Sequence, residues 1–204
     1  MSVNAKLSKI KFYLFTLLIV CNAAAQAQDQ NEADKFAPIM PLLQTCTACH
    51  GDDGVSVIPQ NPILAGQHLH YIYVQLKDFK SGLRENAIMG PIAQGLEKDQ
   101  MLLIAEYYSK QEWPQNTDKD ITPEMALLAK KVINAGQCVA CHLSGFEGGS
   151  GVPRADGQHF DYLQKTLIDF KTKARNNAPA KSSLMASFSD EELTAVAQYL
   201  ATLD

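Results

Sequence analysis

The sequence of 204 residues lacks a hydrophobic run long enough to cross a membrane, a surplus of basic residues, and a pair of cysteines available for a structural disulfide. A transmembrane helix needs about 20 apolar residues, whereas the apolar stretch at residues 12–20 has nine. The 18 basic residues are outnumbered by 22 acidic ones, which argues against nucleic acid as a partner. Four of the five cysteines belong to two short motifs, so no structural disulfide is expected.

The N-terminus has the pattern of a secretory signal. Lysines precede the apolar stretch, and an Ala-Gln-Ala sequence that ends at Ala27 fits a small-residue cleavage site. We therefore predict a signal peptide over residues 1–27, cleavage after Ala27, and a mature protein in the periplasm. A retained anchor is one alternative. Lipidation of Cys21 is another, which the bulky Val20 before it disfavours.

Removal of the signal makes the charge balance more acidic. Residues 1–27 hold three of the 18 basic residues and no acidic one, so 15 basic residues remain against 22 acidic ones, a formal charge of −7. Residues 28–118 hold 12 acidic and 6 basic residues, whereas residues 119–204 hold 10 and 9. Such a difference would orient the encounter with a charged partner, although an ordinary solvated surface explains it equally well.

Two copies of C-x-x-C-H carry the chemistry. They are Cys46-Thr47-Ala48-Cys49-His50 and Cys138-Val139-Ala140-Cys141-His142. In this signature both cysteines form thioethers to haem c and the histidine binds the iron. We therefore predict two covalently bound haem c groups, held by Cys46, Cys49, Cys138 and Cys141, with His50 and His142 as iron ligands. Zinc binding or thiol redox chemistry would not explain a histidine directly after each cysteine pair.

The motifs belong to a longer internal repeat. Gly66-Gln67-His68-Leu69-His70-Tyr71 returns 91 residues later as Gly157-Gln158-His159-Phe160-Asp161-Tyr162. Asp78-Phe79-Lys80 returns at the same displacement, and Ile104-Ala105-Glu106-Tyr107 returns after 92 residues as Val196-Ala197-Gln198-Tyr199. The two halves therefore share one order of elements, which indicates the duplication of a single domain.

Each repeat is predicted to be helical, so the expected fold class is all-α. The i, i+3, i+4, i+7 spacing of an amphipathic helix recurs at Met101, Ile104, Ala105 and Tyr108, and again at Leu193, Val196, Ala197 and Leu200. Ser189 with Glu192 predicts a capping box, and Thr122 before Pro123 predicts the start of a helix over residues 124–139. We place one domain at residues 28–112, a linker at 113–121 and a second domain at 122–204.

Two methionines are candidates for the sixth iron ligand. Met89 and Met185 lie 39 and 43 residues after His50 and His142, in stretches that we predict to be irregular. Packing of a loop edge is the alternative role of such a methionine. Their matched positions in a duplicated haem domain favour ligation, and a Met/His ligand set raises the reduction potential of electron-transfer cytochromes.

On these residues the sequence resembles the cytochrome c4 family of dihaem cytochromes. The resemblance covers nearly all of the mature chain and is carried by both C-x-x-C-H motifs, by residues 49–54, 62–68 and 80–86, by Met89, and by their second-half counterparts. It implies two tandem class I cytochrome c domains, each wrapped around one covalently bound haem. It assigns His50 and Met89 to one iron and His142 and Met185 to the other. It also implies that the carbonyls of Pro62 and Pro153 accept hydrogen bonds from the two histidines.

Some residues depart from the family pattern or lie beside the motifs. Leu143 stands where the first half has glycine, and Arg154 and Asp156 place charges near the second haem, where they would tune its environment. The other histidines, His68, His70 and His159, are expected at the surface or against haem propionates rather than on a metal. Gln67 and Gln158 are expected to pack, with an interface between domains as the alternative.

The resemblance implies one-electron transfer at each haem in a respiratory chain and no enzyme activity. The expected partners are a quinol-oxidising complex or a dehydrogenase as donor and a terminal oxidase as acceptor, with any membrane association peripheral and through these partners. A dedicated cytochrome subunit of a periplasmic dehydrogenase, for sulfur compounds or alcohols, is the alternative. A dihaem enzyme is the third reading, and Met89 and Met185 argue against the open iron position that it needs.

Overall fold

A computed structural model describes residues 34–115 and 120–204. The predicted signal, Cys21 and residues 116–119 of the predicted linker lie outside this described part. Contacts divide the chain into a unit that ends at Met40 and a unit of residues 41–204. The short 3₁₀ helix η1 (Ala37–Ile39) belongs to the first unit. Both haem motifs lie in the second.

The described chain is helical, which confirms the all-α class. No β-strand forms among residues 34–115 and 120–204, where Gly149 and Val152 make an isolated bridge. After η1, the elements are α2 (Met40–His50), η2 (Asp52–Gly54), α3 (Leu69–Ser81), α4 (Met89–Gln94), α5 (Lys98–Ser109), α6 (Pro123–Ala135), α7 (Val139–His142), α8 (Phe160–Thr172), α9 (Pro179–Met185) and α10 (Asp190–Ala201).

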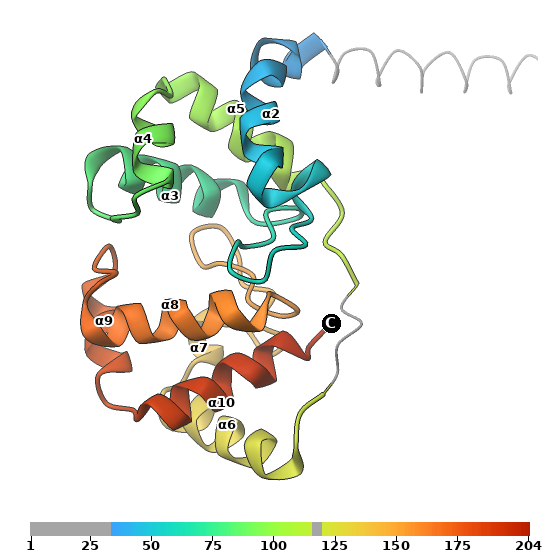
Figure 1. Ribbon diagram of the computed structural model, residues 1–204. Helices are drawn as coiled ribbons and strands as arrows, with labels where there is room; N and C mark the ends of the chain where they lie inside the picture. The colour runs from blue at the N-terminus through green and yellow to red at the C-terminus, as the bar shows by residue number, and fades with distance from the viewer. Residues whose placement is uncertain (1–33, 116–119) are drawn as a thin grey trace, which may run out of the picture. The chain divides into compact units, whose positions relative to one another are not determined.

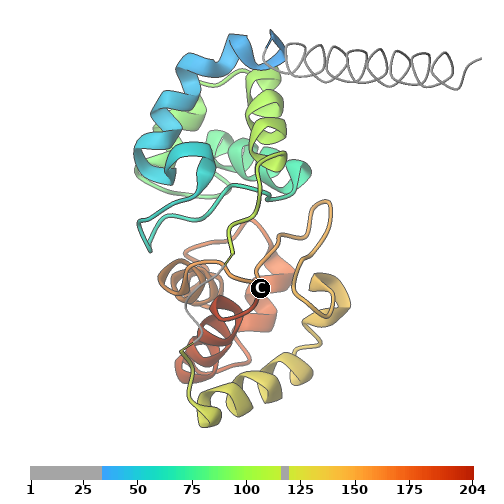
Figure 2. The same cartoon turned by 90° about the vertical axis from the view of Figure 1, so that its right-hand side faces the viewer.

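The two repeats use the same packing scheme. In the first repeat α3 packs against α4 and α5, and in the second α8 packs against α9 and α10. Helix α10 also lies alongside α6, as Figures 1 and 2 show from two directions. Local contacts are repeated as well, because the guanidinium carbons of Arg84 and Arg175 each lie 4.5 Å from the ring centre of Phe79 and Phe170, respectively. The duplication seen in the sequence is therefore a duplication of three-dimensional structure.

The predicted helix faces form the core of the two repeats. All the apolar positions named for them are buried: Met101, Ile104, Ala105 and Tyr108 on α5, and Leu193, Val196, Ala197 and Leu200 on α10. In the second repeat, Val132 and Ile133 of α6 and Leu163 of α8 join Val196, Ala197 and Leu200 of α10 in one cluster. Burying a side chain of this size contributes about 1.5–3 kcal/mol.

The predicted caps are present, but one predicted helix is wrong in length. Ser189 and Glu192 form the capping box of α10, and the Thr122 hydroxyl accepts the Met125 N–H of α6 at 3.3 Å. The helix expected over residues 124–139 instead ends at Ala135, and α7 starts at Val139. The helix is interrupted between them, since Gln137 has a φ of +48°, in the left-handed region, which a right-handed helix cannot pass through.

Candidate haem sites

The first motif lies at the end of α2. One helical turn separates Cys46 from Cys49, and His50 is the last residue of the helix. The His50 Nδ1–H donates to the carbonyl of Pro62 at 2.9 Å, as the family resemblance implied. Burial lowers the pKa of His50, while the bond to Pro62 opposes that shift. The ring is therefore held as a neutral imidazole whose Nε2 remains free to bind a metal.

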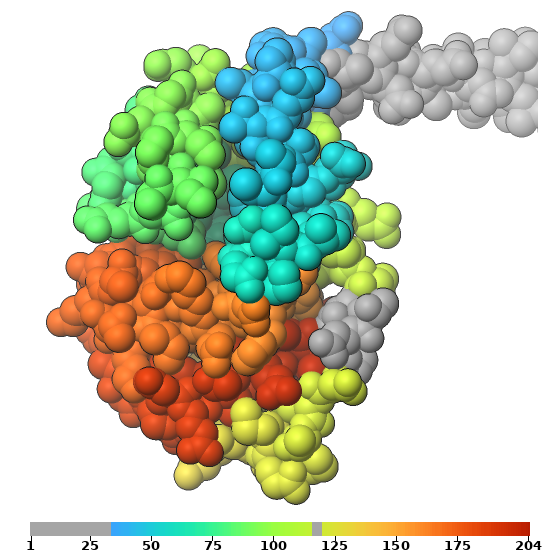
Figure 3. All heavy atoms as spheres, viewed as in Figure 1, coloured from blue at the N-terminus to red at the C-terminus, as the bar shows by residue number. Residues whose placement is uncertain are grey.

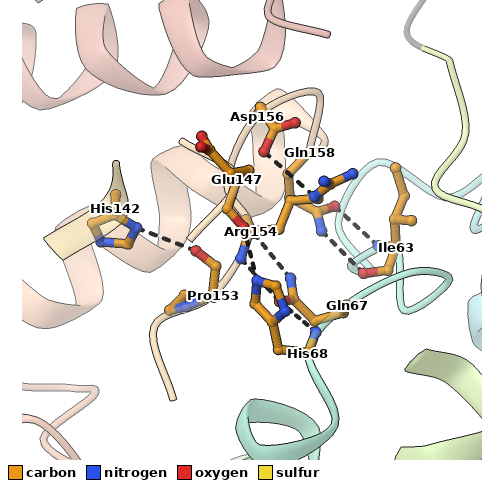
Figure 4. A network of polar contacts seen from close by, with 9 residues as sticks. All are labelled: Ile63, Gln67, His68, His142, Glu147, Pro153, Arg154, Asp156 and Gln158. Atoms are coloured by element: carbon orange, nitrogen blue, oxygen red, sulfur yellow. Dashed lines mark hydrogen bonds and ion pairs between the residues drawn. The ribbon is translucent and has the colours of Figure 1, made fainter. Parts of the chain in front are cut away.

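The second motif is built on a different local structure. Cys138 caps the four-residue helix α7, which carries Cys141 and ends at His142. The His142 Nδ1–H donates to the carbonyl of Pro153 at 3.2 Å, the counterpart of the bond in the first repeat (Figure 4). Burial lowers the pKa of His142, and the positive charge of Lys181 lowers it further.

The two candidate methionines lie on short helices, and the prediction of irregular stretches was wrong. Met89 is the first residue of α4 and Met185 is the last residue of α9. The Asn86 side chain accepts the N–H groups of Ile88 and Met89, which starts α4 within a stretch too short to show a helical period. Helix α9 starts differently, because Pro179 at its first position has a φ suited to a helix and lacks an N–H that would need a partner.

All eight predicted site residues line one cavity of about 700 Å³. They are Cys46, Cys49, His50, Met89, Cys138, Cys141, His142 and Met185. The rest of the lining is largely apolar and includes Ile72, Leu76 and Phe79 in the first repeat and Leu163, Leu167 and Phe170 in the second. In Figure 3 the surface is hollowed between α2 and the green segment that contains α4. Each repeat thus contributes two cysteines, a histidine and a methionine to the wall of a largely apolar cavity.

The state of the cysteines and histidines fits haem c. None of the four motif cysteines is paired in a disulfide. Burial raises the pKa of the Cys46 and Cys138 thiols, so they are not poised as thiolates for redox chemistry. Within the described ranges, no three His, Cys, Asp or Glu side chains are grouped so that they could hold a metal ion. A large apolar cavity with two thiols and one oriented imidazole per repeat is what covalent haem attachment requires.

Two of the remaining histidines join the two repeats, which corrects the expectation of surface or propionate roles. The His68 Nε2–H donates to the Glu147 carbonyl, and the His159 Nε2–H donates to the Ser56 carbonyl, each at 2.8 Å. His70 is exposed, as expected. The equivalent placement of His68 and His159 in the repeat was a signal for equivalent contacts, but the sequence did not show their partners.

Gln67 and Gln158 also bind across the repeats, so the alternative interface role is the right one. Both are buried, at 4% and 3% exposure, and each side-chain amide bonds the backbone of the other repeat. They lie just before α3 and α8, respectively. Sequence reasoning missed these contacts, although the repeated Gly-Gln-His triplet had marked the positions.

Two arginine–tyrosine pairs line the same cavity. The Arg84 Nη2–H donates to the Tyr162 hydroxyl at 3.2 Å, and the Arg175 Nη2–H donates to the Tyr71 hydroxyl at 3.1 Å. Burial alone would raise the pKa of Tyr162, but the two arginines outweigh burial and lower it to about 7. Burial, with Arg175 nearby, lowers the pKa of Lys181 to about 8. The cavity wall therefore combines an apolar lining with a cationic patch.

The charged residues that distinguish the second repeat form a small cluster. The Arg154 Nε lies 3.8 Å from an oxygen of Asp156, and the guanidinium carbon lies 5.2 Å from the ring centre of Trp113. Asp156 is buried, and burial raises its pKa while Arg154 opposes the shift (Figure 4). Arg154 also lines the cavity.

Comparison with known proteins gives consistent matches. The family model described as cytochrome C oxidase, cbb3-type, subunit III, matches residues 125–200. The chain is 38% identical to cytochrome c4 of Thiocapsa roseopersicina over 172 residues, which cover 78% of this chain and 86% of that protein. It is 30% identical to the thiosulfate dehydrogenase electron acceptor of Stutzerimonas stutzeri, with 91% of each chain covered.

A solved structure extends the match to the fold. The structure of reduced recombinant cytochrome c4 from Pseudomonas stutzeri superposes with a TM-score of 0.72 at 28% identity, over 84% of this chain and 97% of that one. Fold and motifs together define an electron-transfer cytochrome of the dihaem c type, with two covalently bound haem c groups in two class I cytochrome domains. The chain belongs to the cytochrome c4 family.

No helix in the described part of the chain is long and apolar enough to cross a membrane.

Proposed function

We propose that this cytochrome is a periplasmic carrier of a respiratory chain, which receives electrons from a quinol-oxidising complex or a dehydrogenase and passes them to a terminal oxidase. In this proposal each haem is bound through two thioethers and two axial ligands. The thioethers come from Cys46, Cys49, Cys138 and Cys141, and the axial ligands are His50 with Met89 and His142 with Met185. The observation that carries the assignment is that one cavity is lined by both complete sets of four residues.

The chain's own residues would set the conditions for fast electron transfer. Each bound haem c supplies one iron that accepts and releases a single electron. The Pro62 and Pro153 carbonyls hold the two imidazoles in one tautomer, because each accepts an Nδ1–H. The apolar side chains that line the cavity would exclude water and keep the dielectric constant around each haem low. These surroundings would change little when the iron is oxidised or reduced. The charge of Met89 and Met185 does not change, so no proton need move at the ligands.

We propose that the protein is not an enzyme. A haem enzyme needs an iron position that substrate can reach, together with groups that act on substrate. The placement of a methionine from each repeat on the cavity wall supports saturated coordination at both irons.

Substitution of both cysteines of one motif by alanine should leave one covalent haem per chain, measured by mass spectrometry. Two remaining haems, or rapid carbon monoxide binding by the unaltered reduced protein, would contradict the assignment.

A second candidate is a dedicated subunit of a periplasmic dehydrogenase for sulfur compounds or alcohols. The similarity to the thiosulfate dehydrogenase electron acceptor of Stutzerimonas stutzeri favours a sulfur-compound enzyme within this candidate. Size-exclusion of native periplasmic extract distinguishes the two. A free carrier elutes as a small protein of no more than 22.4 kDa, the mass of the whole chain with its predicted signal, whereas a subunit elutes with a larger enzyme.

A further inference from the structure

Two buried glutamines each bind one residue of the opposite repeat through both backbone groups. Gln158 accepts the Ile63 N–H at 2.9 Å and donates to the Ile63 carbonyl at 3.1 Å. Gln67 accepts the Arg154 N–H and donates to the Arg154 carbonyl, both at 2.9 Å. Figure 4 shows both pairs of contacts. The glutamines are repeat equivalents, so the arrangement is reciprocal.

The residue that each glutamine binds directly follows the proline that orients a histidine. The Pro62 carbonyl and the Ile63 N–H belong to one peptide group, and the carbonyl accepts the His50 Nδ1–H at 2.9 Å. The same peptide group therefore accepts a hydrogen bond from His50 and donates one to Gln158. In the other repeat, the peptide between Pro153 and Arg154 accepts from His142 and donates to Gln67.

We propose that Gln158 and Gln67 are positioning residues that strengthen electron donation by the histidine of the opposite repeat. The inference rests on the proposed assignment of His50 and His142 as iron ligands. A peptide whose N–H donates a hydrogen bond has a more negative carbonyl oxygen, because consecutive hydrogen bonds polarise one another by about 10–30%. A stronger acceptor at Nδ1 makes the imidazole a more basic metal ligand. Each repeat thus tunes the haem of the other.

The position of the glutamines separates this role from simple docking of the repeats. Other contacts between the repeats avoid the two peptides: His159 binds the Ser56 carbonyl, Gln60 binds Asp161 at 2.7 Å, and the Tyr162 N–H binds the Pro59 carbonyl at 3.1 Å. If the glutamines served only to dock the repeats, replacing one of them would not selectively affect the haem of the opposite repeat. The proposed role predicts a crossed effect.

The test uses haem-loaded Gln158→Met and Gln67→Met variants, in which the side chain keeps its length but can no longer accept the N–H. Two quantities are measured: the proton chemical shift of each histidine Nδ1–H in the reduced protein, and the reduction potential of each haem. Gln158→Met should shift the His50 proton and raise the potential of the His50 haem. Gln67→Met should do the same at His142. The effect should be larger at His50, whose bond to its proline is shorter.

Matched controls are His159→Phe and His68→Phe, which each remove one contact between the repeats without touching the peptides. If the controls move the same proton and potential as much as the glutamine variants, or if each glutamine variant acts on its own repeat, the proposal is wrong. If Gln158→Met does not load haem, Gln158→Asn replaces it in the test. Its side chain is one methylene shorter, so it should give a small shift of the same sign.

The same spectra test the underlying ligand assignment separately. In the unaltered reduced protein, each Nδ1–H should carry the ring-current displacement of a histidine bound to haem iron. Absence of that displacement overturns the ligand assignment. Its presence, with no crossed response in the variants, overturns only the role of the glutamines.

Discussion

The Arg175 guanidinium donates an N–H to the hydroxyl of Tyr71, 3.1 Å away in the other repeat. In the equivalent pair, Arg84 of the first repeat donates to the hydroxyl of Tyr162 in the second repeat at 3.2 Å. The reciprocity is incomplete, because Arg175 is 5% exposed and donates to Gln75 of the opposite repeat at 2.8 Å, whereas Arg84 is less buried and donates to Gln75 of its own repeat at 3.0 Å. Because Arg175 is more buried than Arg84, it should contribute more to the stability of the folded protein.

Replacement of Arg175 by methionine should lower the free energy of unfolding by about 2–3 kcal/mol, because Tyr71 and Gln75 would lose a buried donor. The matched variant Arg84→Met should cost about 1 kcal/mol, since Arg84 is more exposed and water can replace part of what its partners lose. Urea unfolding of both haem-loaded variants measures the difference. Equal losses would show that burial does not distinguish the two arginines.

Gly54 has no room for a side chain. Its φ is +84°, and a Cβ atom there would lie 2.7 Å from a ring carbon of Tyr108 and 2.8 Å from the Ala65 nitrogen. Gly54→Ala should therefore lower the free energy of unfolding by about 2–3 kcal/mol, from backbone strain and the clash together.

The control for this substitution is Gly82→Ala. Gly82 has a similar φ of +78° but nothing within 4 Å of the added atom. Strain alone should cost about 1 kcal/mol. Thermal or urea unfolding gives both values, and a Gly82 variant as unstable as the Gly54 variant would show that the clash at Tyr108 contributes nothing.

Asp156 should make stability depend on pH. Burial raises its pKa in the folded protein above 3.8, its ordinary value. The folded state then holds a proton that the unfolded state has released, so stability from this group is complete below the ordinary pKa and is lost as the pH rises through the folded pKa. Asp156→Asn removes the titration.

The measurement is the urea midpoint of both proteins from about pH 4 to pH 7. The advantage of Asp156→Asn over the parent should grow as the pH rises across that window. An advantage that stays constant, or shrinks, would mean that the contact with Arg154 outweighs burial.

The sequence predicted the features that depend on short, regular patterns. The helix faces at Met101–Tyr108 and Leu193–Leu200 follow from apolar periodicity, which packing against α3 and α8 uses directly. The capping residues Ser189 and Thr122 were found for the same reason, because a cap acts within one helical turn.

The errors concern structure that such patterns do not specify. Helix α4 has six residues, and the Asn86 side chain starts it, so no periodicity announced that Met89 would be helical. The positive φ at Gln137 divides a stretch that the apolar residues alone predicted as one helix. Contacts between repeats, such as that of His159 with Ser56, join residues about a hundred positions apart, and a duplicated motif marks the position without naming the partner.

The most direct test of the account is an optical redox titration of the haem-loaded protein with Met89 and Met185 each replaced by alanine. The weak near-infrared band of the oxidised protein reports methionine bound to ferric iron. Each substitution should remove about half of that band and lower the potential of one haem, because loss of a methionine ligand lowers the potential. If either substitution leaves the band and both potentials unchanged, that methionine only fills the cavity, and the assignment of two His/Met haems is wrong.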